Sequence, residues 1–241
     1  MIKKTKGIIL RQIKYSESSV IAHIYTEHFG RLSILINGVG VKRKSRRIKL
    51  LQPLSILDME IYRKPSRDIQ RVKEMSLHIP YSQIPFCPEK NAIALFISEI
   101  LYKTLREQEA NPALFEFLSN SLQILDIRER HFANFHLVFL MNLSKYLGFF
   151  PLDNFSDSSA VFDMMNGKYV DAVPWHPNFV KPPLSGVISR LQALNYENLN
   201  SLPLSGTQRI HLLEMLMDYY RLHIDNFGEV NSIKILHKVF H

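Results

Sequence analysis

The sequence predicts an α+β protein in which a small β-barrel of the OB type is followed by a mainly α-helical domain. Three observations lead to this prediction. The first 80 residues contain short runs rich in β-branched residues, with apolar positions at alternate places. A segment with Pro80, Pro85 and Pro88 follows, and beyond it apolar residues recur with the helical period. We therefore predict two domains, residues 1–80 and 81–241.

Five strands are expected in the first domain. The third alternates most clearly, with Leu32, Ile34 and Ile36 on one face, and in the fifth Ile69 and Val72 are predicted to point inward. Five short strands in about 70 residues suit a closed barrel, which leaves no exposed sheet edge. A small sandwich or an SH3-like barrel fits the strand pattern nearly as well. The predicted strands are 7–13, 20–26, 31–39, 54–62 and 69–77.

The second domain is predicted to contain helices and one irregular insertion, at about residues 149–183. Asn111 before Pro112 is typical of a helix start, and Gly148 is suited to end a helix. The insertion holds five prolines and the single tryptophan, and Asn166-Gly167 predicts a hairpin turn in it. The predicted helices are 89–107, one from residue 112 to 125, 131–147, 187–194, 207–224 and 232–240.

Positive charge is concentrated in the first third of the chain. The net charge is +8, but residues 1–80 carry 17 Lys and Arg against 6 Asp and Glu, so they alone have +11. Lys42, Arg43, Lys44, Arg46, Arg47 and Lys49 place six cations within eight residues, with no acid among them. Such a run repels itself, and its usual compensation is a nucleic-acid backbone. The alternative is a solvated charged loop.

We predict that these six side chains contact phosphates and that Arg31, Arg63 and Arg67 form the rim of the site. Tyr15, Phe29 and Tyr62 are candidate platforms for stacking with bases, although at least two of them are expected to belong to the barrel core. Such a cationic surface would lower the repulsion between two nucleic-acid strands without reading their bases.

No pattern of catalytic chemistry is found. The sequence has no phosphate-binding glycine loop, no His-Glu-x-x-His motif and no serine in a nucleophile elbow, and His131 and His136, five residues apart, do not share a helical face. Its one cysteine, Cys87, excludes an internal disulfide and a cysteine-rich zinc site. We therefore expect a protein that is not an enzyme and has no cofactor. No signal peptide or membrane span is predicted, so the expected location is the cytoplasm, in association with the nucleoid.

A set of local features in a fixed order resembles the RecO family of bacterial DNA repair proteins. The resemblance covers nearly the whole chain, and the ordered set carries it because no single piece is diagnostic. The set comprises Gly7-Ile8-Ile9-Leu10, Tyr15-Ser16-Glu17, Thr26-Glu27-His28-Phe29-Gly30, Asn37-Gly38-Val39, the basic stretch, Leu51-Gln52-Pro53-Leu54, Leu147-Gly148-Phe149-Phe150-Pro151 and Glu229-Val230-Asn231-Ser232.

The resemblance implies an N-terminal OB barrel and a C-terminal helical domain. It also implies binding of single- and double-stranded DNA, strand annealing, and partnership with RecR and with the acidic tail of single-strand-binding protein, so that recombinase is loaded onto coated strands. Many relatives carry a four-cysteine zinc module after the Leu-Gly-x-x-Pro stretch, but this chain has no cysteine there. We therefore expect a metal-free version of the module that keeps its hairpin.

The tail of single-strand-binding protein would need an apolar pocket with a cationic rim, for which Arg128, Arg130 and Lys145 are the predicted partner-binding residues. Two other functions remain open at this point. One is an OB-type RNA-binding factor, which a strong preference for RNA over DNA would favour. The other is an assembly scaffold whose basic face meets an acidic protein, which undetectable nucleic-acid binding at moderate salt would favour.

Overall fold

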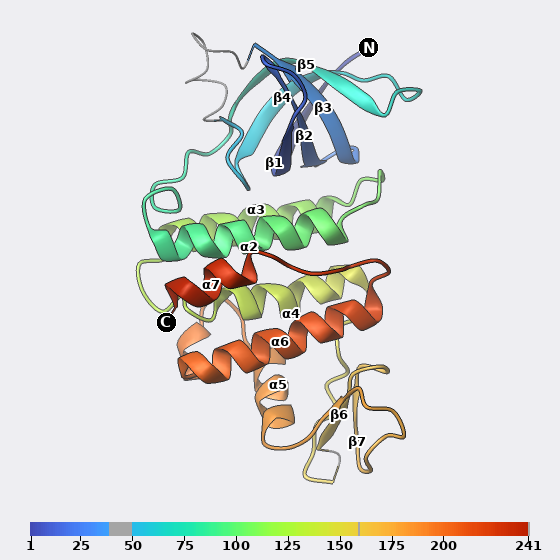
Figure 1. The fold of residues 1–241 in the computed structure, drawn as a ribbon, viewed down its shortest axis with the longest axis vertical. Coiled ribbons are helices and arrows are strands. Elements are labelled where there is room, and N and C mark those ends of the chain that lie inside the picture. The colour runs from blue at the N-terminus through green and yellow to red at the C-terminus, as the bar shows by residue number, and fades with distance from the viewer. Residues whose placement is uncertain (39–49, 159, 241) are drawn as a thin grey trace. The chain divides into compact units, whose positions relative to one another are not determined.

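The strands expected in the first 80 residues form a closed barrel (Figure 1). The computed structural model describes residues 1–38, 50–158 and 160–240. The barrel order is β1-β2-β3-β5-β4, with β1 paired to β4 and only the β3–β5 pair parallel. This is the predicted OB-type arrangement, and the alternatives of a sandwich and an SH3-like barrel are wrong. The strands are β1 (Ile2–Lys14), β2 (Ser19–Thr26), β3 (Gly30–Asn37), β4 (Ile56–Tyr62) and β5 (Ile69–Leu77).

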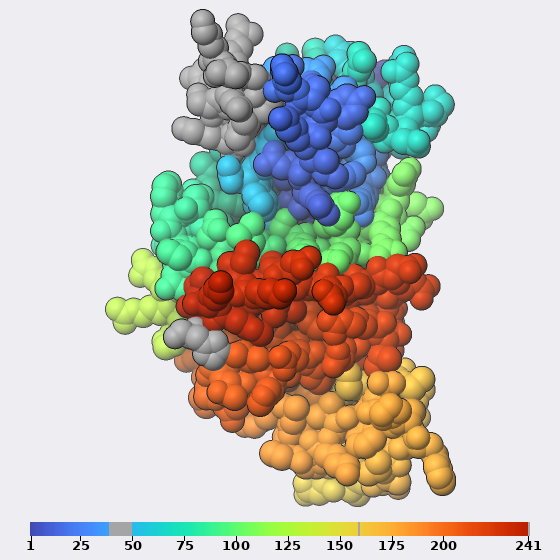
Figure 2. Space-filling view, viewed as in Figure 1, coloured from blue at the N-terminus to red at the C-terminus, as the bar shows by residue number. Residues whose placement is uncertain are grey.

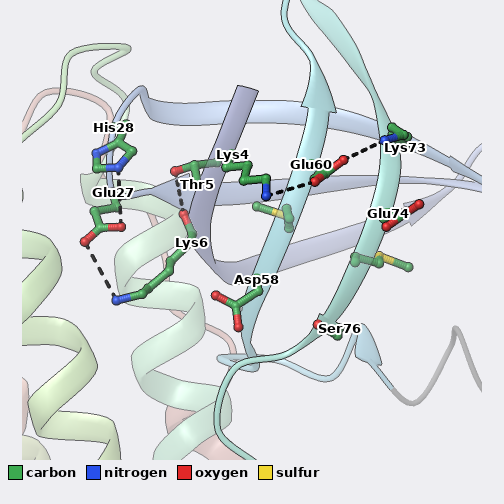
Figure 3. Close-up of a pocket in the computed structure, with 12 residues that line it drawn as sticks. Lys4, Thr5, Lys6, Glu27, His28, Asp58, Glu60, Lys73, Glu74 and Ser76 are labelled. Carbon is green, nitrogen blue, oxygen red and sulfur yellow. Dashed lines mark hydrogen bonds and ion pairs between the residues drawn. The ribbon is translucent and has the colours of Figure 1, made fainter. Parts of the chain in front are cut away.

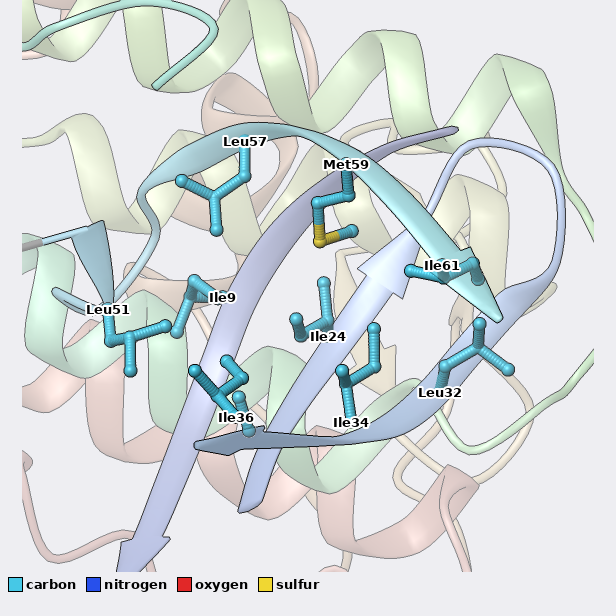
Figure 4. Packing of buried hydrophobic residues seen from close by; sticks show 10 residues of the cluster. Ile9, Ile24, Leu32, Ile34, Ile36, Leu51, Leu57, Met59 and Ile61 are labelled. Atoms are coloured by element: carbon cyan, nitrogen blue, oxygen red, sulfur yellow. The ribbon is translucent and has the colours of Figure 1, made fainter. Parts of the chain in front are cut away.

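The barrel interior is filled by the alternating apolar residues of its strands (Figure 4). The inward positions predicted on β3 are confirmed, because Leu32, Ile34 and Ile36 are all buried. The prediction for β5 is half wrong. Val72 packs against the core, but Ile69 is 40% exposed and its neighbour Gln70 is 2% exposed. The core cluster comprises Ile9, Ala22, Ile24, Leu32, Ile34, Ile36, Leu51, Leu57, Met59 and Ile61.

The chain divides into two compact units. The first is Met1–Ile127 with Val230–Val239, and the second is Arg128–Glu229 with the C-terminal end. The first unit therefore holds the barrel together with the helices α2 (Pro88–Thr104), α3 (Pro112–Ile127) and α7 (Ile233–Val239). The domain boundary predicted at residue 80 marks the change from strands to helices, and as a domain boundary it stays a prediction.

Helices α2 and α3 cover part of the outer face of β1 and β2. Ser98 on α2 donates a hydrogen bond of 2.6 Å to the carbonyl of Leu10, and Phe115 on α3 stacks on Tyr25 at 6.5 Å between ring centroids. The start of α3 is as predicted, since the side chain of Asn111 accepts the N–H of Leu114 at 3.0 Å. Both helices thus pack directly against barrel strands.

The proline-rich segment between β5 and α2 is held in place by Asp126 at the end of α3. Its carboxylate accepts the backbone N–H groups of Ser82, Gln83 and Ile84 at 2.7–2.8 Å. Burial by itself raises the pKa of Asp126, but these hydrogen bonds outweigh it and leave the pKa below its ordinary value. The ammonium group of buried Lys90 donates to the carbonyl of Asp126 at 2.7 Å. A segment that composition predicts as a linker is therefore an anchored part of the first unit.

The last helix, α7, belongs to the first unit, and hydrogen bonds to Glu99 of α2 hold its start in place. The carboxylate of Glu99 accepts the N–H of Asn231 at 3.0 Å and both the N–H and the hydroxyl of Ser232 at 2.8 and 2.6 Å. Burial opposes ionisation here too, but the hydrogen bonds from Ser232 and Asn231 outweigh it and lower the pKa of Glu99. The ionised carboxylate is thus part of what fixes α7.

We expect Glu99→Gln to lower the free energy of unfolding by about 1–2 kcal/mol near neutral pH. Because the pKa is lower in the folded chain, the contribution of Glu99 is present above its unfolded value of about 4.3 and is lost as the pH falls through the folded value. Urea unfolding of both proteins should therefore show a difference at about pH 7 that shrinks on acidification. The exposed Glu116 gives the control, Glu116→Gln, and an equal effect there would contradict the assignment.

The second unit contains α4 (Phe135–Leu147), α5 (Leu184–Gln192), α6 (Gly206–His223) and a small sheet. The stop at Gly148 is confirmed, with φ 86°. Helix α4 begins four residues later than predicted because His131 has φ 58°, which a helix does not accept. The hairpin at Asn166-Gly167 is confirmed in the sheet β7-β6-β8, formed by β6 (Val161–Asp163), β7 (Lys168–Val170) and β8 (Phe179–Val180). In the described ranges no helix has the length and apolar character required to cross a bilayer.

Candidate nucleic-acid interface

The densest predicted phosphate contacts lie outside the described residues. These are Lys42, Arg43, Lys44, Arg46, Arg47 and Lys49. The described residues on either side belong to the barrel, since β3 ends at Asn37 and Leu51 is fully buried in the core. The basic stretch therefore lies, in sequence, between two segments that belong to the barrel. Its part in binding stays a prediction.

The loop between β4 and β5, residues 63–68, is the cationic element that the structure does describe. It stands out from the barrel as the turquoise loop of Figures 1 and 2. The guanidinium group of Arg63 lies over the ring of Phe29 at 5.3 Å, and its backbone N–H donates to the carbonyl of Met1 at 3.0 Å. Lys64 and Arg67 are exposed, and within the described residues neither forms an ion pair. Two of the three predicted rim residues, Arg63 and Arg67, thus share one loop.

Arg31, the third predicted rim residue, is engaged by the end of α2. Its guanidinium group donates to the carbonyls of Tyr102 and Leu105 at 2.9 and 3.2 Å and lies over the Tyr102 ring at 4.4 Å. Burial, reinforced by the charges of Arg31 and Arg11, lowers the pKa of nearby His23. Arg31 therefore binds the last carbonyls of a helix and connects α2 to β3, and its contact with phosphates stays a prediction.

The predicted stacking residues are more exposed than expected. Tyr15 is 63% exposed and Tyr62 is 45% exposed, whereas Phe29 packs against the barrel core beneath Arg63. The expectation that at least two of the three belong to the core is wrong. Tyr15 lies just after β1 and Tyr62 ends β4, so neither side chain reaches the interior. Both rings are free to meet a base, which is the condition for stacking.

A hollow of about 680 Å³ lies on the barrel beside β1, β4 and β5, and the lysines that line it are already paired with carboxylates (Figure 3). Glu60 accepts from Lys73 at 2.8 Å and from Lys4 at 3.4 Å, and Lys6 lies 4.0 Å from Glu27. The hydrogen bond from Lys73 also lowers the pKa of Glu60, so this carboxylate stays ionised. Cations that are neutralised by carboxylates offer little to phosphates. The hollow is therefore a weak candidate for binding DNA.

The predicted partner-binding residues, all in the second unit, do not form one cluster. Arg128 donates to the carbonyl of Tyr196 at 2.6 Å and to that of Arg130 at 3.1 Å. Lys145 lies in the last turn of α4, with its ammonium group 4.5 Å from the centroid of the Phe150 ring. Arg130 precedes the start of α4, so about 15 Å of helix separates these two cations. A pocket rimmed by all three is therefore not supported, and their individual roles stay predictions.

The insertion in the second unit does not fit a structural zinc ion. Such a site needs four thiolate or imidazole ligands, and the only cysteine, Cys87, belongs to the first unit. Within the described residues no group of three or more His, Cys, Asp and Glu side chains is suited to a metal. Hydrogen bonds hold the insertion instead. Asn154 pairs with both the N–H and the carbonyl of Tyr169, and Asp163 accepts the N–H groups of Met165 and Asn166.

A barrel of the OB type with a cationic loop, followed by a helical region, defines a class of protein that binds nucleic acids. Comparison with known proteins gives the family. The model of the family described as "Recombination protein O N terminal" matches residues 1–81, and that described as "Recombination protein O C terminal" matches residues 87–229. The chain belongs to the RecO family, and its role is in DNA repair and recombination.

Curated relatives support the same family. A "DNA repair protein RecO" from Phocaeicola vulgatus is 37% identical over 240 residues, covering 100% of both chains. Proteins of the same name from Flavobacterium psychrophilum and Porphyromonas gingivalis are 34% and 33% identical, covering 98% and 100% of each chain. The similarity therefore extends over both halves of the chain, barrel and helical region alike.

Proposed function

We propose that the protein anneals complementary single strands and helps to load recombinase onto DNA coated with single-strand-binding protein. No nucleotide is hydrolysed in these steps. The main observation behind the proposal is the distribution of unpaired positive charge on an OB barrel. The ion-paired face beside β1 and β4 contrasts with Lys64 and Arg67 of the β4–β5 loop, which form no ion pair within the described residues. The six cations of residues 42–49 add further positive charge to the N-terminal third of the sequence.

The mechanism is electrostatic. Two phosphate backbones repel each other, and a surface that binds both releases their counterions and lowers that repulsion. Contacts to phosphates carry no sequence information, so pairing between the strands themselves selects the product. The exposed rings of Tyr15 and Tyr62 support this mechanism, because stacking holds a base without reading its edge. Neither the binding of phosphates nor the stacking of bases requires an oxyanion hole, a nucleophile or a metal.

The proposal includes two protein partners, RecR and the acidic tail of single-strand-binding protein. The tail ends in an apolar residue and therefore needs an apolar pocket with a nearby cation. Arg130 and Lys145, at opposite ends of α4, are the two places to test, since each is exposed. A single tail occupies only one of them.

Annealing of strands coated with single-strand-binding protein tests the proposal directly. The unaltered chain should anneal bare strands without nucleotide, and it should anneal coated strands only when the coating protein keeps its tail. Arg130→Glu and Lys145→Glu are made separately, and we expect one of them to reduce annealing of coated strands about tenfold while leaving bare strands unaffected. If deletion of the tail has no effect, the partnership is wrong. If bare strands are not annealed, the proposed activity is wrong.

A further inference from the structure

Gln70, at the start of β5, is a buried amide in a position where an apolar residue is expected. It is 2% exposed and is paired in register with Ile34 of β3, whose side chain is fully buried in the core. A primary amide placed among apolar side chains is unfavourable unless its hydrogen bonds are satisfied. The contacts of Gln70 therefore indicate why the residue is tolerated there.

Among the described residues, every hydrogen bond of the Gln70 side chain goes to the backbone of the β4–β5 loop. Its Oε1 accepts the N–H of Lys64 at 2.8 Å, and its Nε2 donates to the carbonyl of Lys64 at 3.0 Å and to that of Arg67. The N–H of Arg67 donates to the carbonyl of Lys64 at 3.1 Å, which closes a turn with Pro65 at its second position. One side chain thus holds both sides of the loop.

The loop held in this way presents two cations to solvent. Lys64 and Arg67 flank the turn, both are exposed, and within the described residues neither is ion-paired. Lys4 and Lys73, on the adjacent strands, are instead paired with Glu60. A loop that is ordered before binding does not lose conformational freedom when it meets its ligand.

We propose that Gln70 is a positioning residue: it holds residues 63–68 in the conformation in which Lys64 and Arg67 contact adjacent phosphates of a DNA strand. Gln70 itself does not touch the DNA. This inference rests on the proposed function, because it needs DNA as the ligand, and it adds a second phosphate-binding element that is built into the barrel and separate in sequence from residues 42–49.

The variant Gln70→Met tests the inference, because Met fills a similar volume in the barrel and offers no amide. Two results are expected. Trypsin should cleave the Arg67–Asp68 bond faster, as followed by mass spectrometry without DNA, because the loop is no longer held. Binding of a single-stranded oligonucleotide should weaken about tenfold, and the slope of log K against log salt should become shallower by about 1. Gln12→Met, at an exposed position of β1, is the matched control.

The two cations are tested in the same assay. Lys64→Gln with Arg67→Gln should weaken DNA binding in the unaltered chain but add little in the Gln70→Met background, because both changes remove the same contacts. Pro65→Gly loosens the loop without altering the barrel interior, so it replaces Gln70→Met in the test if that variant fails to fold. We expect Pro65→Gly to weaken DNA binding by a similar factor.

The possible failures are distinguishable. If the unaltered chain binds no DNA, the proposed function is wrong, and the inference is overturned with it. If DNA is bound and Gln70→Met and Pro65→Gly keep the affinity and the salt slope of the unaltered chain, the inference alone is overturned. Faster cleavage of Arg67–Asp68 with unchanged DNA binding has the same meaning, because Gln70 would then order a loop that does not contact DNA.

Discussion

Reversal of four charges in the basic stretch, Arg43→Glu, Lys44→Glu, Arg46→Glu and Arg47→Glu, is expected to abolish strand annealing. These side chains belong to the densest run of positive charge in the chain. If four to six phosphates are contacted, log K for single strands should fall against log salt with a slope of roughly −3 to −4. The variant should show a slope much closer to zero, measured by fluorescence anisotropy over a series of salt concentrations.

A control variant must carry the same change in net charge at another place. Lys168→Glu, Arg190→Glu, Lys234→Glu and Lys238→Glu are suitable, because all four side chains are exposed and lie outside the barrel. This control should keep most of the annealing activity and the original salt slope. An unchanged slope in the variant of the basic stretch would reject that stretch as the site. Equal losses in both variants would mean that only the overall charge matters.

Asp126→Ala is expected to lower the free energy of unfolding by about 3 kcal/mol near neutral pH. The change leaves the N–H groups of Ser82, Gln83 and Ile84 without their acceptor, and Ile84 is 3% exposed. Because the folded chain lowers the pKa of Asp126, this stabilisation is present above the unfolded value of about 3.9 and is lost as the pH falls through the folded value. Urea unfolding followed by circular dichroism at several pH values measures both effects.

Two further variants give the comparison for Asp126. Asp126→Asn keeps the size of the side chain but replaces one acceptor oxygen with a donor, so it should destabilise the chain nearly as much as alanine does. Glu109→Ala removes an exposed carboxylate and should change stability by less than about 0.5 kcal/mol. A loss at Asp126 no larger than that at Glu109 would show that the segment before α2 is held by other contacts.

Much of the fold could be predicted from the local pattern of residues. Alternation of apolar residues placed β3 correctly, with Leu32, Ile34 and Ile36 inside, because in a half-buried strand successive side chains point to opposite faces. The starts and stops marked by Asn111 and Gly148 were also correct, since caps depend on neighbours three or four residues away. Such signals are short in range, and a single sequence contains them.

Long-range contacts could not be predicted in this way. Glu99 forms hydrogen bonds with Asn231 and Ser232, which lie 132 and 133 positions later in the chain. The hydrogen bonds of Arg31 with Tyr102 and Leu105 span 71 and 74 positions. Charge alone favoured Arg31 as a phosphate ligand, because a sequence does not show which carbonyl groups a guanidinium group will meet. Ile69 was expected to point inward because it is hydrophobic. The buried position is instead taken by Gln70, whose amide forms hydrogen bonds with the backbone of the β4–β5 loop.

By itself, the sequence determined the class of fold, the uneven distribution of charge and the lack of cysteine ligands for zinc, because each of these depends only on which residues are present and in what order. The tertiary structure alone decided which cations are neutralised, as Lys4 and Lys73 are by Glu60, and which remain unpaired in the described part of the chain, as Lys64 and Arg67 do. The physical reason is distance: the attraction between two charges depends on their separation in space, and strand pairing brings together residues that are far apart along the chain.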